Sequence, residues 1–270
     1  MKPDRETYRP PWLLWAVAAL AILVGGLSLY REVTGQNDGS DLRADPRLAP
    51  VHQAQLLEVA RTAYALLRTP EFAAVLKAAA DDQPVYVSRD RGERSAEAVL
   101  ADLTGRGRYL PVRLVMMDPY APGARGHYAA GGGVGYVSQD GEIHLPPDVL
   151  ADWASGDLVR QSCALNTLAH EIAHTISISP FVFTPAFTDT RIGERAIPRR
   201  DGGDSPVASY LIGSAAQCAW LQQQGRIVAS EVRACVNVFG TRGFNDRCRA
   251  FTADEPIRER PGLPPPMRPL

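Results

Sequence analysis

Apolar side chains recur at three- and four-residue intervals over residues 52–80, the spacing of a helix that buries one face. The recurring residues are Leu56, Ala60, Ala63, Tyr64 and Leu67. Because Pro70 interrupts the run, the pattern predicts one helix followed by a second, shorter one. Beyond them, runs of β-branched and large apolar residues predict strands at 84–90 and 109–117, with a helix near 94–103 between the two.

Helical spacing returns in the second half of the chain. The predicted helices run from about Ser155 to Pro180, from Pro206 to Gln224, and over about 229–238. For the middle helix, Ser205 is the expected N-cap and Gly225 the expected end, because glycine readily adopts the positive φ that often follows a helix. The tail 256–270 is so rich in proline that it is expected to be extended.

A hairpin is predicted just before the Ser155 helix, where "GYVSQDGEIHL" (135–145) combines strand-forming residues with a central turn. Asp140-Gly141 supplies the positive φ angles that a two-residue turn requires. The sequence thus predicts both helices and short strands. The body is therefore expected to be α+β, with a small mixed or antiparallel sheet packed on the helix that begins near Ser155.

The segment "PPWLLWAVAALAILVGGLSLY" (10–30) carries no charge and is flanked by Arg9 and Arg31. Its length is close to the ~20 residues that a helix needs to cross a bilayer. Tryptophan and tyrosine lie near its ends, where such rings favour the headgroup level. The sequence thus predicts a transmembrane helix at 12–30. A cleaved signal peptide would need a small-x-small site that this segment lacks, and a buried core helix accounts less well for a segment with no polar face.

The chain is therefore divided into five parts: a cytoplasmic N-terminus at 1–11, the span at 12–30, a flexible linker at 31–50, the body at 51–255 and the tail at 256–270. Basic residues on both sides of the span favour, without fixing, a single-pass protein whose body lies in the periplasm or outside the cell.

Charge and cysteine content narrow the class further. The formal net charge is -1 and no sustained basic run is present, so nucleic acid is not an expected partner. The four cysteines are Cys163, Cys218, Cys235 and Cys248. In an oxidising compartment they can form two disulfides with three possible connectivities, although four separate buried thiols fit the sequence as well.

The stretch "TLAHEIAHTI" (167–176) carries the chemistry. His170 and His174 are four residues apart, so on a helix both imidazoles leave the same side, within about 40° of each other. The apolar residues expected on the opposite side are Leu165, Leu168, Ile172 and Ile176. Paired imidazoles at this spacing are good Zn²⁺ ligands, and Glu171 emerges beside them without being placed to ligate.

These residues resemble the HExxH zinc metallopeptidases, the zincins. The likeness extends to the uncharged neighbours of the motif, among them Thr167 and Ile176. It implies a zincin-like catalytic domain in which zinc activates a water and Glu171 acts as the general base. It covers this helix and, loosely, the hairpin before it, since zincins place an edge strand above the helix to pair with an extended substrate.

A catalytic zinc normally has three protein ligands, but the third is not obvious in this sequence. No histidine follows His174, and the next predicted helix contains no acid, so neither the metzincin nor the gluzincin pattern is followed. The candidates are Asp189, Asp204, Glu194 and Asp201. Asp189 is favoured because it lies fifteen residues after His174 in "AFTDT", which resembles the aspzincin arrangement, although the spacing in that family is shorter.

The sequence therefore predicts a membrane-anchored zinc metallopeptidase that hydrolyses peptide or protein substrates, with His170, His174 and Asp189 as ligands. The main alternative is a non-catalytic, membrane-anchored binding or assembly protein with a structural metal site. A deformylase-like hydrolase is disfavoured because the upstream "EGC" sequence is missing. Tyr210 is a candidate oxyanion donor, but its place on an apolar stripe favours a role in the core.

Overall fold

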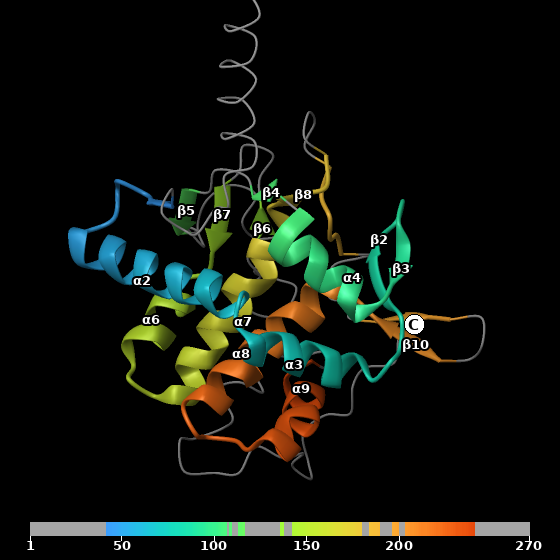
Figure 1. The fold of residues 1–270 in the computed structure, drawn as a ribbon. Coiled ribbons are helices and arrows are strands. Elements are labelled where there is room, and N and C mark those ends of the chain that lie inside the picture. The colour runs from blue at the N-terminus through green and yellow to red at the C-terminus, as the bar shows by residue number, and fades with distance from the viewer. Residues whose placement is uncertain are drawn as a thin grey trace, which may run out of the picture. The chain divides into compact units, whose positions relative to one another are not determined.

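The computed structural model describes residues 42–106, 108–109, 113–116, 136–137, 142–179, 184–189, 196–199 and 203–240. In this part of the chain helices pack with small sheets, so the predicted α+β class is confirmed (Figure 1). The predicted span at 12–30 and the tail at 256–270 lie outside it. Over the residues described, no helix combines the length and hydrophobicity needed to cross a bilayer.

The two helices predicted over residues 52–80 are α2 (Pro50–Leu66) and α3 (Pro70–Ala80). Each has a proline in its first turn, where the missing N–H would have no partner within the helix anyway. Thr69 caps α3 by accepting a hydrogen bond from the Phe72 N–H, and Asp81 ends it in the left-handed conformation. Pro70 therefore starts the second helix as well as separating it from the first.

The largest sheet has the strand order β1-β5-β7-β6. Its strands are β1 (Arg43–Ala44), β5 (Arg113–Met116), β7 (Glu142–Leu145) and β6 (Tyr136–Val137). β1 and β7 run parallel to β5, whereas the edge strand β6 is antiparallel to β7. The β6–β7 pair is the predicted hairpin, and its Asp140-Gly141 turn lies outside the described residues. Since β1 belongs to this sheet and Leu42 is buried, the folded body takes in part of the predicted linker.

The remaining described strands form antiparallel pairs. They are β2 (Val85–Ser88) with β3 (Gly92–Arg94), β4 (Arg108–Tyr109) with β8 (Ile176–Ser177), and β9 (Ala196–Pro198) with β10 (Asp204–Pro206). Helix α4 (Ala96–Ala101) and the π-helical turn η1 (Asp102–Arg106) follow β3, as the sequence predicts. The single strand predicted at 109–117 is instead divided between β4 and β5, because these strands pair with different partners.

Helix α7 (Leu158–His174) carries both histidines of the HExxH stretch. Helix α6 (Asp148–Ala154) separates it from the hairpin, so the hairpin does not directly precede α7. Asp157 caps α7 by accepting a hydrogen bond from the Arg160 N–H. The predicted continuation to Pro180 is wrong, because the chain leaves the helix after His174 and pairs as β8 with β4.

The apolar residues expected opposite the histidines, Leu165, Leu168 and Ile172, are buried, and most of the rest of α7 is buried as well, between α2, α6 and α8 (Figure 1). The contact of α7 with α8 (Ala208–Gln223) is partly polar. Asn166 donates a hydrogen bond to Gln217 Oε1 at 2.7 Å, and Gln217 Nε2 donates one to Ser162 Oγ at 3.1 Å. Polar side chains can be buried here because each has a partner on the facing helix.

Helix α8 starts after Val207, so the predicted N-cap Ser205 is wrong; Ser205 lies in β10 and its hydroxyl donates to Glu93. Gly225 follows the helix with φ of +68°, as predicted. The short helix η2 (Ala229–Glu231) and α9 (Val232–Gly240) match the predicted third helix. A disulfide between Cys218 and Cys235 joins α8 to α9.

Candidate metal centre

His170 and His174 lie on the last turn of α7 with their rings nearly perpendicular, at an interplanar angle of 89°. Their Nε2 atoms are 3.2 Å apart. Both side chains are largely buried, with 9% and 17% of their surface exposed. The helical spacing therefore brings the two imidazole nitrogens to one point, as the sequence predicts.

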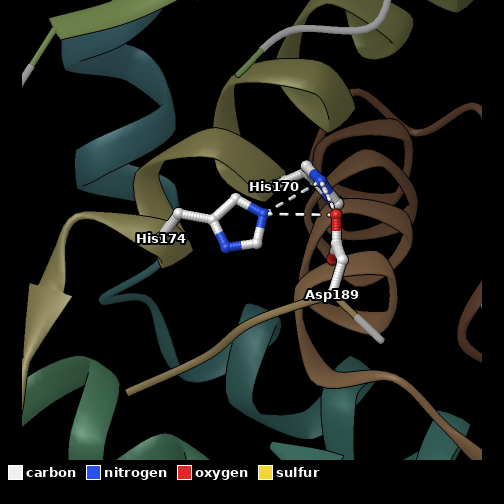
Figure 2. A group of neighbouring side chains, drawn as sticks. All are labelled: His170, His174 and Asp189. Atoms are coloured by element: carbon white, nitrogen blue, oxygen red, sulfur yellow. Dashed lines mark hydrogen bonds and ion pairs between the residues drawn. The ribbon is translucent and has the colours of Figure 1, made fainter. Parts of the chain in front are cut away.

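Asp189 reaches the same point from the strap, the segment of residues 184–189 that follows β8 (Figure 2). Backbone hydrogen bonds hold the strap on two sides: the Ala186 N–H donates to Ile176 O at 2.7 Å, and the Thr188 N–H donates to Val87 O at 2.8 Å. The Arg91 guanidinium also donates to the Ala186 carbonyl, at 3.2 Å. The position of Asp189 is thus fixed by pairing with β8 and β2.

The three side chains meet at atoms that face one another. Asp189 Oδ2 is 3.4 Å from His170 Nε2 and 3.5 Å from His174 Nε2. Ligand atoms about 2.0–2.2 Å from a tetrahedral ion are roughly 3.3–3.6 Å from each other. A search of the described residues for clustered histidine, cysteine and acidic side chains finds these three as a group that could hold a metal ion.

Two further contacts orient the candidate ligands. The Phe187 carbonyl lies 3.1 Å from His174 Nδ1. Because a carbonyl can only accept, Nδ1 carries the proton and Nε2 faces Asp189 and His170. On the other side, the Ser209 hydroxyl of α8 donates to Asp189 Oδ1, which leaves Oδ2 facing the histidines. Such partners fix both the tautomer of a histidine ligand and the direction of a carboxylate.

In the metal-free protein, Asp189 and the two histidines shift one another's pKa values. Burial works to raise the pKa of Asp189, but hydrogen bonds and charge attraction from His170 and His174 outweigh it and hold that pKa well below its usual range. Burial works to lower the pKa of His174, but Asp189 and Glu171 raise it to about 9. At neutral pH a carboxylate therefore faces an imidazolium, and a bound proton occupies the place where a cation would be held.

Glu171 points into the interior beside the group. Its side chain is 1% exposed, and Oε1 lies 3.9 Å from His170 Nε2. Oε2 is buried and has no hydrogen-bond partner in the described structure. Burial raises the pKa of this carboxyl, against the opposing charge of the two histidines. A buried carboxylate oxygen without a partner is costly, and such groups concentrate at functional sites.

Tyr210 lies against the centre rather than in the core that the sequence favoured for it. Its ring centroid is 4.5 Å from that of His170 at an interplanar angle of 47°, and its side chain is half-buried. The sequence prediction failed because other residues of the apolar stripe, among them Val207 and Leu211, are buried, whereas Tyr210 is only half-buried and contacts His170.

The other candidates lie elsewhere or outside the described residues. Asp204 is exposed on β10 and does not join the group. Glu194 and Asp201 are not among the described residues. Cys163 is disulfide-bonded, as one of the sequence interpretations expected, and its partner lies outside the described part of the chain.

Sequence reasoning missed Ser209 and the Phe187 carbonyl. Ser209 is fully buried in the first turn of α8, twenty residues after Asp189. A serine near a predicted helix start is usually explained by capping, and a backbone carbonyl has no residue signature, so neither could be recognised before the strap was placed.

Comparisons with protein-family models, with curated proteins and with solved structures find no match for this chain.

Proposed function

We propose that this protein is a membrane-anchored zinc metallopeptidase. The observation that supports this most directly is the triangle of His170 Nε2, His174 Nε2 and Asp189 Oδ2, with sides of 3.2, 3.4 and 3.5 Å. Two imidazoles and one carboxylate suit zinc and related transition metals, and they suit calcium or magnesium poorly. The residues present therefore fit a zinc ion.

Bound there, zinc would supply a water acidic enough to lose a proton near pH 7 and would polarise a substrate carbonyl. Glu171 takes the proton from the attacking water and passes it to the leaving amine. Its buried and unpartnered Oε2 is suited to this, since a carboxyl with a raised pKa can both accept and return a proton. His174, held by the Phe187 carbonyl, and Asp189, held by Ser209, keep the ligand atoms in place.

The three candidate ligands among the described residues fit the pattern of a catalytic zinc site. Structural zinc sites are closed by four protein ligands, whereas catalytic sites use three and leave one position for water and substrate. The group found among the described residues has three members, and the side chain of Asp189 keeps 27% of its surface exposed. Solvent can therefore approach the centre from the side of Asp189.

Two other features support the proposed cellular placement. The uncharged segment 10–30 would anchor the chain in a membrane. The Cys218–Cys235 disulfide is typical of proteins that fold in oxidising compartments. The proposal is a catalytic body in the periplasm or outside the cell, acting on peptide or protein substrates.

The Glu171→Gln variant tests the proposal most directly. The full chain, purified in detergent, should hold close to one equivalent of zinc and cleave casein, and a chelator should abolish the cleavage. Glu171→Gln should keep the zinc and lose about 10²- to 10⁴-fold in rate, because only the proton acceptor is removed.

Glu58→Gln on the exposed face of α2 is the matched control and should behave as the wild type. Equal cleavage by the wild type, by Glu171→Gln and by chelated protein would refute the peptidase proposal. Stoichiometric zinc without any hydrolysis would instead favour the binding or assembly protein.

A further inference from the structure

We propose that Ser209 keeps Asp189 a one-oxygen ligand and thereby sets the metal preference of the centre, an inference that rests on the proposed zinc site. Its basis is how the two carboxylate oxygens of Asp189 are used. Oδ1 accepts the hydrogen bond from the Ser209 hydroxyl, while Oδ2 faces both histidine nitrogens at 3.4 and 3.5 Å.

Ser209 lies in the first turn of α8, and its hydroxyl bonds outside its own helix. Farther along a helix, a serine hydroxyl commonly donates to a carbonyl of the preceding turn. Ser214 does this on the same helix, donating to Tyr210 O at 2.9 Å. Ser209 is equally buried but reaches across to Asp189, on a segment twenty residues earlier. Because a serine side chain is short and α8 is packed against α7, the direction of this hydrogen bond is fixed by the scaffold.

The direction matters because a carboxylate can bind a metal through one oxygen or two. Coordination through both oxygens raises the number of ligands and suits ions that accept six or more, such as Mn²⁺ or Ca²⁺. Zn²⁺ prefers four. By engaging Oδ1, Ser209 keeps that oxygen from the ion and so favours a four-coordinate metal.

The neighbouring residue strengthens the argument that this turn of α8 serves the centre. The ring of Tyr210 packs against that of His170 in a tilted arrangement, with centroids 4.5 Å apart. Consecutive residues of α8 therefore contact two of the three candidate ligands, Asp189 and His170. The histidines come from α7, and the first turn of α8 supports them and Asp189 from the other side.

Ser209→Ala and Ser214→Ala form a matched pair of variants. Both remove a buried hydroxyl from α8, but only the first removes a partner of Asp189. In the full chain, stripped of metal and kept in detergent, Zn²⁺ and Mn²⁺ dissociation constants are measured by competition with a chromophoric chelator. We expect Ser209→Ala to weaken Zn²⁺ binding about 10- to 100-fold and to weaken Mn²⁺ binding far less, whereas Ser214→Ala should leave the ratio unchanged.

Cobalt spectra give a second readout, one that does not depend on catalytic activity. Co²⁺ in the wild-type protein should show the intense d–d bands of four-coordination, and Ser209→Ala should weaken them as the second oxygen of Asp189 joins. If Ser209→Ala does not fold, the coordination of Co²⁺ in the wild-type protein alone still tests the inference.

The possible results separate this inference from the proposed function. Wild-type protein that binds no Zn²⁺ would overturn both. Zn²⁺ binding with an equal loss for both metals in Ser209→Ala, or weak six-coordinate bands in wild-type Co²⁺ protein, would overturn the role of Ser209 and leave the metal site standing.

Discussion

His174 binds a proton in the metal-free protein at the position where it would otherwise bind a metal. Its pKa is raised to about 9 by Asp189 and Glu171, from an ordinary value of 6.5. Folding therefore gains stability from this group that is fully present below pH 6.5 and is lost as the pH rises through about 9. Asp189 has the opposite pH dependence, because its pKa is lowered by folding. It stabilises the fold at every pH above its ordinary pKa, and this stability is lost only in strong acid.

From these shifts we predict that the chelated protein loses on the order of 3 kcal/mol of unfolding free energy between pH 6.5 and 9. Denaturant unfolding at half-unit pH steps measures it. Asp189→Asn, which removes the main partner of His174, should flatten the profile. A wild-type profile that is already flat would show that the pair is not ionised as described.

Metal affinity should depend on pH in the opposite direction and rise as the pH rises. A metal binds only the deprotonated imidazole, so below pH 9 the proton on His174 must leave first. We predict that the Zn²⁺ affinity rises by up to about tenfold per pH unit from pH 6 to 8, and that binding releases close to one proton. Calorimetry in two buffers of different ionisation enthalpy counts the released protons, and a count of zero would contradict this linkage.

At the residue scale the sequence was informative where the chemistry is local. His170, Glu171 and His174 lie within one turn, so their mutual placement follows from helix geometry alone. Asp189 could be ranked first because of its distance from His174 and its apolar neighbours, but its contact with the histidines depends on pairing of the strap with β8 and β2. The pairing with β2 joins Thr188 to Val87, which lie 101 positions apart, and local patterns do not encode such a contact.

At the scale of elements, α7 and α8 approach closely because Gly213 has no side chain. A Cβ atom at this position would lie 2.5 Å from Asn166 Oδ1 and 2.9 Å from the Asn166 carbonyl oxygen. Both atoms belong to α7, one turn before His170. The spacing of the two helices, and so the position of Ser209 and Tyr210 at the centre, depends on this glycine.

Gly213→Ala should therefore destabilise the fold by about 1–3 kcal/mol, although alanine is the better helix former, because the helices must move apart or Asn166 must break its bond with Gln217. Thermal unfolding measures the loss. Ser214→Ala, at the next position of the same helix, should cost less because it introduces no overlap. A gain in stability for Gly213→Ala would mean that helix propensity outweighs the contact.

Element boundaries show where sequence patterns give way to tertiary pairing. Ile176 continues the apolar spacing of α7, yet it lies in β8 because β4 and the strap offer backbone partners there. Ser205 is a good N-cap residue, yet it lies in β10 and bonds to Glu93. In contrast, α2 and α3 each begin at a proline and Thr69 caps α3, and these two helices were predicted almost to their ends.

At the scale of the whole molecule, the disulfide stabilises the scaffold at a distance from the chemistry. Cys218 and Cys235 are 17 positions apart, and closing such a loop contributes about 3 kcal/mol in the chain-entropy account. We predict that replacing both by serine lowers the melting temperature by roughly 6–12 °C. The Zn²⁺ affinity should stay unchanged, since Ser209 and Tyr210 lie at the opposite end of α8. A parallel loss of affinity would show that α9 supports the centre.

The predicted anchor is tested on intact cells or vesicles. The full chain should remain in the membrane fraction after alkaline carbonate washing, because the uncharged segment 10–30 would have to leave the bilayer core. A variant without residues 1–41 should move to the soluble fraction and keep its Zn²⁺ affinity. Recovery of the full chain in the soluble fraction would contradict the anchor.

The strap has a consequence for how such centres can vary among proteins. The Ile178 N–H donates to Thr184 O at 2.9 Å, so the two ends of the intervening stretch are tied together just beyond β8. With its ends tied, that stretch can lengthen or shorten at little entropic cost while Asp189 stays where it is. Distant homologues could thus share the three ligands and the serine that orients the third, yet differ in the interval of fifteen residues that separates His174 from Asp189 in this chain.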